Sequence, residues 1–119
     1  MEHASEYHAT EIGIESENDV LVAAIALEPE GYMMFQRGAS EATGRSNGCY
    51  FEFSDQSQGN YDIVRKCSLK ERKLRISLDM PLNGITEISV SLANVENSVS
   101  ALKNQLTRVF EGTKGVFRH

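Results

Sequence analysis

The sequence predicts an α+β fold: a mainly antiparallel β-sheet of about six to seven strands, with one C-terminal α-helix packed on its apolar face. The strands follow from short segments in which apolar and polar residues alternate, the period of a half-buried strand. The helix follows from a change of period after Asn94, where apolar residues recur every three or four positions. The chain has 119 residues, 40% of them hydrophobic, which fits a single domain over residues 1–119.

The first part of the chain predicts a strand, a second strand and its hairpin partner. Residues 7–15 alternate and place two isoleucines on one face, whereas residues 20–27 are nearly all apolar. Such a run suits a central strand covered on both faces. A short buried helix has the same pattern, and the length of the run favours the strand. Pro29, Glu30 and Gly31 supply a turn, and residues 32–36 return beside the second strand.

Further alternating runs in the second half predict a four-strand meander with one apolar face. Their apolar residues are, in order, Cys49, Phe51 and Phe53; Ile63, Cys67 and Leu69; Leu74, Ile76, Leu78 and Met80; and Ile88, Val90 and Leu92. Asn83 and Gly84 separate the last two runs and form a strong tight-turn signal. Residues 38–48 are the longest irregular stretch, and no contact is assigned to them.

The closing helix is predicted from apolar residues at helical spacing: Val95, Val99, Leu102, Leu106, Val109 and Phe110. Asn94 is the expected N-cap and Gly112 the expected stop. We expect this helix to cover the apolar face of the meander, where each buried side chain contributes about 1.5 to 3 kcal/mol. Residues 1–6 and 113–119 are expected to be frayed tails.

Two features predict a cytoplasmic protein. No segment approaches the roughly eighteen consecutive apolar residues of a membrane-spanning helix. The first residues also lack the basic and apolar regions of a signal peptide. Cys49 and Cys67 fall in phase with apolar neighbours, so we expect reduced core thiols, with a disulfide as the less favoured alternative.

The sequence lacks a recognisable catalytic or metal-binding set. The three histidines lie near the chain ends, where a base is poorly held against a nucleophile. No C-x-x-C pair offers metal ligands, and Arg45 stands where a phosphate-binding loop carries lysine. Glu52 and Asp55 form a conceivable acid pair, but carboxylates are common at exposed corners. We therefore predict a protein that is not an enzyme and carries no cofactor and no metal.

Charge is unevenly distributed along the chain. The net charge is −5, and residues 1–36 contain eight acids and no lysine or arginine. Six basic residues gather within eleven positions that hold one acid: Arg65, Lys66, Lys70, Arg72, Lys73 and Arg75. We expect the acidic part to attract a basic protein, because such fields raise association rates. Both clusters also fit solvated strand faces, and the overall acidity argues against nucleic acid as a partner.

The polar corner at residues 54–61 differs from the other connections. It carries the carboxylate of Asp55, several amides including Gln56, and the phenol of Tyr61. These groups provide directional hydrogen bonds at little hydrophobic cost, which favours recognition of a partner. The alternative is an Asx-type turn, in which the polar side chains bond their own backbone.

A series of motifs runs from this corner to the helix. It comprises Phe-Glu-Phe-Ser-Asp-Gln at 51–56, a Gly-Asn-Tyr bend at 59–61, an alternating basic segment at 68–78, and a helix that ends Arg-Val-Phe at 108–110. In this order the elements resemble the immunity protein 10 family of bacterial polymorphic toxin systems, over about residues 18–112. The resemblance implies a protein that binds a cognate protein toxin and neutralises it by occluding the active site. A basic nuclease would suit the acidic part of the chain.

The candidate contact residues combine this resemblance with the chemistry of the corner. Glu52, Asp55, Gln56 and Tyr61 are expected to bind the partner, and Glu28 and Glu30 to steer it.

Two other classes of function stay open. A non-catalytic assembly subunit, including a homodimer, could use an exposed sheet edge, for which residues 7–15 are the candidate. A small-molecule-binding domain would need a concave pocket between sheet and helix with converging polar groups. Neither a nucleic acid nor a membrane is an expected partner.

Overall fold

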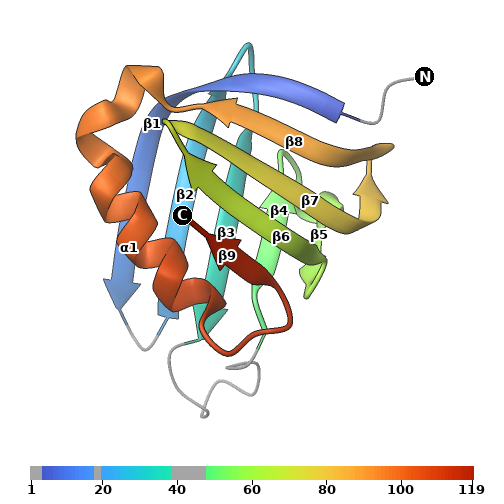
Figure 1. Ribbon diagram of the computed structural model, residues 1–119. Helices are drawn as coiled ribbons and strands as arrows, with labels where there is room; N and C mark the ends of the chain where they lie inside the picture. Colours follow the sequence, from blue (N-terminus) through green and yellow to red (C-terminus); the bar gives the residue numbers. More distant parts are fainter. Residues whose placement is uncertain (1–3, 18–19, 39–47) are drawn as a thin grey trace.

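The computed structural model describes residues 4–17, 20–38 and 48–119. These residues form one mixed, mostly antiparallel sheet of nine strands with a C-terminal helix against it (Figure 1). The strands are β1 (Ala4–Glu17), β2 (Val20–Glu28), β3 (Tyr32–Gly38), β4 (Tyr50–Phe53), β5 (Gly59–Tyr61), β6 (Val64–Lys70), β7 (Lys73–Leu82), β8 (Ile85–Ser91) and β9 (Val116–Arg118). A short 3-10 helix, η2 (Gln56–Gln58), precedes β5, and another, η3 (Ala93–Ser98), leads into the helix α1 (Val99–Phe110).

The α+β class is confirmed, with more strands than the six or seven expected. Two of the additional strands, β5 and β9, are three residues long, too short to show a period of two in the sequence. Most of the irregular stretch predicted at residues 38–48 lies outside the described residues, because these leave out residues 39–47.

Strand β1 joins two layers of the sheet. Its first residues pair in parallel with β8, and the residues from His8 onward pair antiparallel with β2. The register shifts between Ala9 and Glu11, so Thr10 is the extra residue of a β-bulge, a feature that bends a strand. Beyond this bend the chain continues down the back of the molecule (Figure 1). The sheet order β5-β4-β3-β2-β1-β8-β7-β6-β9 therefore folds into a β1–β5 layer and a β6–β9 layer.

The hydrophobic core lies between the two layers and under α1. Its fully buried members with the largest side chains are Phe35, Phe51, Ile25, Met33, Leu74, Ile76, Ile88, Leu92, Leu102, Leu106, Val90 and Val109. The rings of Phe35 on β3 and Phe110 on α1 pack with centroids 5.9 Å apart. The helix contacts β1, β2, β3 and β9, and thereby closes one side of the space between the layers.

Two polar side chains fix the position of α1. Gln105 is buried, and its amide donates to the carbonyls of Glu15 at 2.8 Å and Val22 at 3.1 Å. The guanidinium of Arg37 donates to the carbonyls of Arg108, Val109 and Glu111 at the end of α1. A cation is favourable there because the last carbonyls of a helix carry partial negative charge.

The predicted ends of the helix were partly right. Gly112 has a φ of 72° and follows the last turn, as expected of a helix stop. Asn94 is not the N-cap of α1, because it lies inside η3, and α1 begins after Ser98. The apolar spacing from Val95 onward does not distinguish a 3-10 turn from the first turn of an α-helix.

The predicted four-strand meander was wrong. Strand β4 pairs with β3 and β5, whereas β6 pairs with β7 and β9, so of the four predicted strands only β6, β7 and β8 form a meander together. The link at Asp62 and Ile63 carries the chain from one layer to the other. A period of two identifies a strand but not its neighbour, so the sequence pattern could not reveal this crossing.

Strand β2 is covered fully on one face only. Its inward residues, including Leu21 and Ile25, are at most 5% exposed, whereas Val22, Ala24 and Ala26 on the outward face are half-buried. Within this chain, the second face of the strand is therefore not covered as expected. The segment is nearly all apolar because its outward positions also carry apolar residues. These are small and form part of the protein surface.

Both predicted tails contain strands. Residues 4–6 belong to β1 and pair with β8, and Val116–Arg118 form β9 beside β6. The predicted edge strand at residues 7–15 was also wrong, because β1 lies inside the sheet between β2 and β8. The edges are β5 and β9, and short edge strands limit pairing with other chains.

Candidate partner-binding surface

The outward face of the β1–β5 layer carries a row of tyrosines beside small apolar residues. Residues directly opposite in neighbouring strands share a face, and the register places Tyr32 beside Ala26, Glu52 beside Met34, and Tyr61 beside Tyr50. We call this surface the tyrosine face and define it by Val22, Ala24, Ala26, Tyr32, Met34, Gln36, Tyr50, Glu52 and Tyr61. Helix α1 packs on the opposite side of the layer, against inward residues such as Phe35.

A buried carboxylate lies at the centre of the tyrosines. Glu52 is 5% exposed, and its Oε1 accepts a hydrogen bond from the Tyr50 hydroxyl at 2.6 Å. Its Oε2 accepts a second one from the Tyr32 hydroxyl. Buried carboxylates require such donors. The position of Glu52 suits a residue that orients two tyrosines, and not one that touches a partner directly.

The two hydroxyls are held in their protonated form. The hydrogen bond to Glu52 is the main cause that raises the pKa of Tyr32 to about 12, followed by loss of solvation and repulsion by the Glu52 charge. The same causes raise the pKa of Tyr50 to about 12. A tyrosinate here would lose its donor hydrogen and place a second negative charge beside the carboxylate. The cluster is therefore stable as a donor–acceptor unit at neutral pH.

Because of these raised pKa values, we expect the stability of the fold to fall at alkaline pH. Because the pKa of Tyr32 and Tyr50 is higher in the folded than in the unfolded chain, their protons stabilise the fold below about pH 10, and this contribution is lost as the pH rises towards 12. We expect the tyrosinate absorbance of the folded protein to include a component near pH 12 that Y32F/Y50F removes. Circular dichroism recorded in parallel reports whether the fold persists. Complete ionisation of the tyrosines near pH 10 in the folded state would contradict the assignment.

Tyr61 extends the tyrosine face to the sheet edge. Its ring packs edge-on against Tyr50, with centroids 5.3 Å apart, and it is half-buried. Gly59 makes room for Tyr50, because a Cβ at this position would lie 2.5 Å from the Tyr50 hydroxyl oxygen. The glycine of the Gly-Asn-Tyr bend thus allows the Tyr50 ring to cross its neighbouring strand.

In the corner after β4, the side chain of Asp55 bonds to its own neighbour in the chain. Its Oδ1 accepts from the backbone N–H of Ser57 at 2.8 Å and from the Ser57 hydroxyl at 2.9 Å, and these bonds lower the pKa of Asp55. The Asx-type alternative is thus confirmed for this side chain, which caps η2 and remains exposed. The side chain of Gln56 lies outside the described part of the structure.

The structure brings Glu28 and Glu30 to the same end of the layer as the corner. Both are exposed in the turn between β2 and β3. Ser54 links this turn to the corner, because its N–H donates to the Tyr32 carbonyl at 2.8 Å and its hydroxyl oxygen accepts from the Tyr32 N–H at 3.3 Å. The predicted residues Glu28, Glu30 and Asp55 therefore belong to one end of the layer, whereas Tyr61 pairs with Tyr50 further along the strands, on the far side of Glu52 from the corner.

Several members of the tyrosine face were not predicted. Tyr32, Met34 and Tyr50 lie on it, and the exposed Glu11, Glu15 and Glu17 of β1 border it, opposite Ala26, Val22 and Val20. One sequence signal was available for Tyr50: it alternates with Phe51 and Phe53 and therefore faces away from the core. The pairing of β4 with β3, which brings Tyr32 near Glu52, required the structure.

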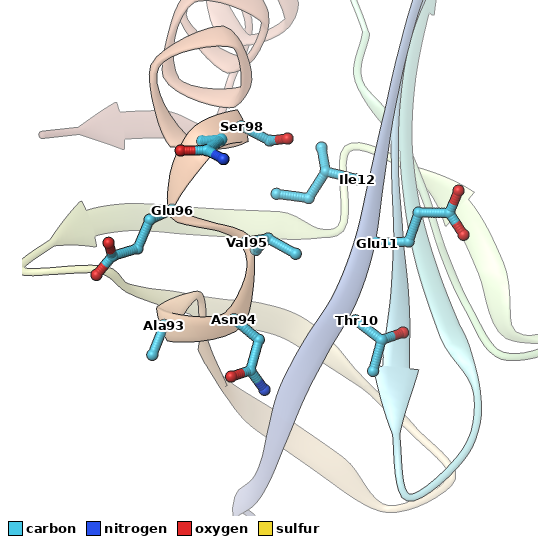
Figure 2. Close-up of a pocket in the computed structure, with 9 residues that line it drawn as sticks. Thr10, Glu11, Ile12, Ala93, Asn94, Val95, Glu96 and Ser98 are labelled. Carbon is cyan, nitrogen blue, oxygen red and sulfur yellow. The ribbon is translucent and has the colours of Figure 1, made fainter.

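A groove lies where β1 bends past η3. It is an open groove of about 480 Å³, lined by Thr10, Glu11, Ile12 and residues 93–98. Figure 2 shows Ile12 and Val95 directed into the groove, whereas the carboxylates of Glu11 and Glu96 point away from it in opposite directions. These two carboxylates therefore do not converge inside the groove, as polar groups of a ligand site would.

The remaining reactive groups are structural. Cys49 and Cys67 are free and buried, and burial raises the pKa of Cys49 to about 12 and that of Cys67 well above its usual value. The expected core thiols are confirmed. Among the described residues, no group of His, Cys, Asp and Glu side chains is placed to hold a metal ion. In those same segments, no helix has the length and apolar character that crossing a membrane requires.

Comparison with known proteins gives no further assignment. No model of a known protein family matches the chain, and no curated protein sequence is significantly similar to it. Any assignment of function to this chain therefore rests on its own structure.

Proposed function

We propose that this chain is a protein-binding domain that neutralises a cognate bacterial toxin by covering its active site with the tyrosine face. The observation that carries this proposal is the Glu52 carboxylate, which is buried under half-exposed tyrosines on a sheet face that α1 does not cover. Tyrosine and methionine are enriched at protein interfaces, where aromatic anchors supply most of the binding energy. A polar group that holds such anchors in place limits the entropy lost on binding.

The charge around the tyrosine face favours a basic partner. Glu11, Glu15 and Glu17 lie along one side of it, and Glu28, Glu30 and Asp55 lie at one end. A border of one sign accelerates encounter with a surface of the other sign and excludes partners of like charge. A nuclease is a suitable toxin, because its own substrate requires a basic groove. The immunity protein would act in the cytoplasm of the cell that makes the toxin.

The tyrosine face requires little rearrangement to bind. Its strands β2, β3 and β4 are paired on both sides, and its side next to β1 consists of the short side chains of Val22, Ala24 and Ala26. A preformed surface on paired strands supports rigid docking, which is typical of inhibitor complexes. An assembly subunit that acts through a sheet edge receives less support, because the described edge strands are only three residues long.

Growth rescue tests the proposal. The product of the neighbouring gene is expressed in a test bacterium with and without this chain, and surviving colonies are counted. We expect the chain to restore growth, and Ala24→Arg to abolish rescue because it places a long cation on the tyrosine face, beside Met34. Ser89→Arg is the matched control, since Ser89 lies on β8 in the other layer, opposite Glu6.

Thermal unfolding of both variants shows whether each one folds. Rescue by Ala24→Arg at the level of the unmodified chain would exclude the tyrosine face as the contact surface. A neighbouring gene product that is harmless on its own would favour the assembly subunit instead.

A further inference from the structure

The outward face of the β6–β9 layer is basic. We call it the basic face and define it by Lys66, Ser68, Lys70, Lys73, Arg75 and Arg118. The register places Lys70 opposite Lys73, and Ser68 between Arg75 on β7 and Arg118 on β9. The intervening residues Cys67, Leu69 and Leu74 point into the core, so the basic side chains all project from one surface. This surface faces away from the tyrosine face, because the two layers pack against each other through their inner sides.

Three positive charges of the basic face, at and near the hairpin end of β6 and β7, form no ion pair in the described part of the chain. In the described segments, the ion pairs of this layer join Arg65 on β6 to Glu87 on β8 at 3.8 Å, and Arg72 in the β6–β7 turn to Glu96 on η3. Lys70, Lys73 and Arg75 form none within those segments. Like charges directly opposite in a sheet are destabilising. An anion bound between them would relieve this repulsion.

The surface also has a shape suited to an anionic group. A depression of about 350 Å³ is lined by Ser68, Lys70, Glu71, Lys73 and Arg75. It offers three cationic side chains and one hydroxyl, against one carboxylate. Lys73 and Arg75 are two residues apart on β7, so their side chains repeat at about 6.8 Å. Alternate side chains of an extended peptide repeat at the same distance.

We propose that the basic face is a second docking surface and binds an extended acidic segment of a protein. Carboxylates at alternate positions of such a segment match the repeat of Lys73 and Arg75 and reach Lys70 across the hairpin. Nucleic acid is a poorer fit, because the outward residues of β6, β7 and β9 on this face include no aromatic ring on which bases could stack. The occupant can bind while a toxin covers the tyrosine face, since the two surfaces lie on opposite sides.

Fluorescence anisotropy with a labelled decapeptide of alternating Glu and Ser tests this proposal. We expect binding at low ionic strength that weakens with added salt. The variant K70Q/K73Q/R75Q should bind about tenfold more weakly, a loss consistent with three exposed ion pairs. The control K103Q/R108Q/K114Q removes the same charge from α1 and the segment after it, and its affinity should change by less than about twofold. R75Q alone serves as the test variant if the triple variant does not fold.

Three results would overturn the proposal. The first is an absence of binding to the unmodified chain at low salt. The second is an equal loss in the control variant, which would show that only net charge matters. The third is tighter binding of a ten-nucleotide oligothymidylate that competes with the peptide and is lost in K70Q/K73Q/R75Q, which would identify a nucleic-acid surface. None of these results bears on the tyrosine face.

Discussion

A chain that ends at Asn94 is expected to be unfolded. The truncation removes α1, and with it Leu102, Leu106, Val109 and Phe110, which are at most 4% exposed. Together these four side chains contribute about 6 to 12 kcal/mol of burial energy at about 1.5 to 3 kcal/mol each. That is as large as the whole free energy of unfolding of a typical domain, about 5 to 15 kcal/mol. The inner face of the sheet would also be exposed to water where the helix now covers it.

Urea denaturation followed by circular dichroism measures this effect. The control is a chain that ends at Gly112, which keeps α1 and loses β9 together with the packing of Phe117 on Phe110. We expect the control to unfold cooperatively with reduced stability, and the shorter chain to show no cooperative transition. A fragment of residues 1–94 that melts cooperatively would show that the two layers are stable without the helix.

The importance of α1 could be predicted from the sequence, whereas the path of the sheet could not. Helical spacing from Val99 to Phe110 is local information, since each apolar residue repeats within a few positions. The pairing of β1 with β8 joins residues more than eighty positions apart, and the bulge at Thr10 follows directly after the paired residues. No local pattern encodes which strand lies beside which. The sequence therefore predicted most elements correctly and misplaced β1 and β4 in the sheet.

The candidate surface was likewise predicted only in part from the sequence. Glu52 and Tyr61 were selected from the sequence, and both lie on the tyrosine face. The alternation of strand β4 predicts that Glu52 points away from the core. It does not predict that Glu52 is buried on the outward face. Its burial results from Tyr32, which comes from β3, twenty residues earlier in the chain. An acidic residue on the outward side of a strand is usually solvated, so only the tertiary structure reveals its partners.

Replacing Glu52 with alanine is expected to lower the free energy of unfolding by about 2 to 3 kcal/mol, because it leaves the hydroxyls of Tyr32 and Tyr50 without their acceptor. The neutral Glu52→Gln should cost less, since its amide oxygen can still accept one hydroxyl. The tyrosine rings would also lose their fixed orientation in the alanine variant. We therefore expect affinity for the partner to fall by about tenfold or more, as for other interface anchors.

A double-mutant cycle separates positioning from direct contact. In the Y32F/Y50F background the rings remain but no longer donate to Glu52, so the carboxylate is buried without these partners. Removing it there should be neutral or stabilising, because replacing every member of a buried polar group by apolar atoms avoids the desolvation cost. The free energies of unfolding from urea titrations test this on the chain alone. If Glu52→Ala cost the same in both backgrounds, Glu52 would act independently of the tyrosines, and its assignment as the residue that positions them would be wrong.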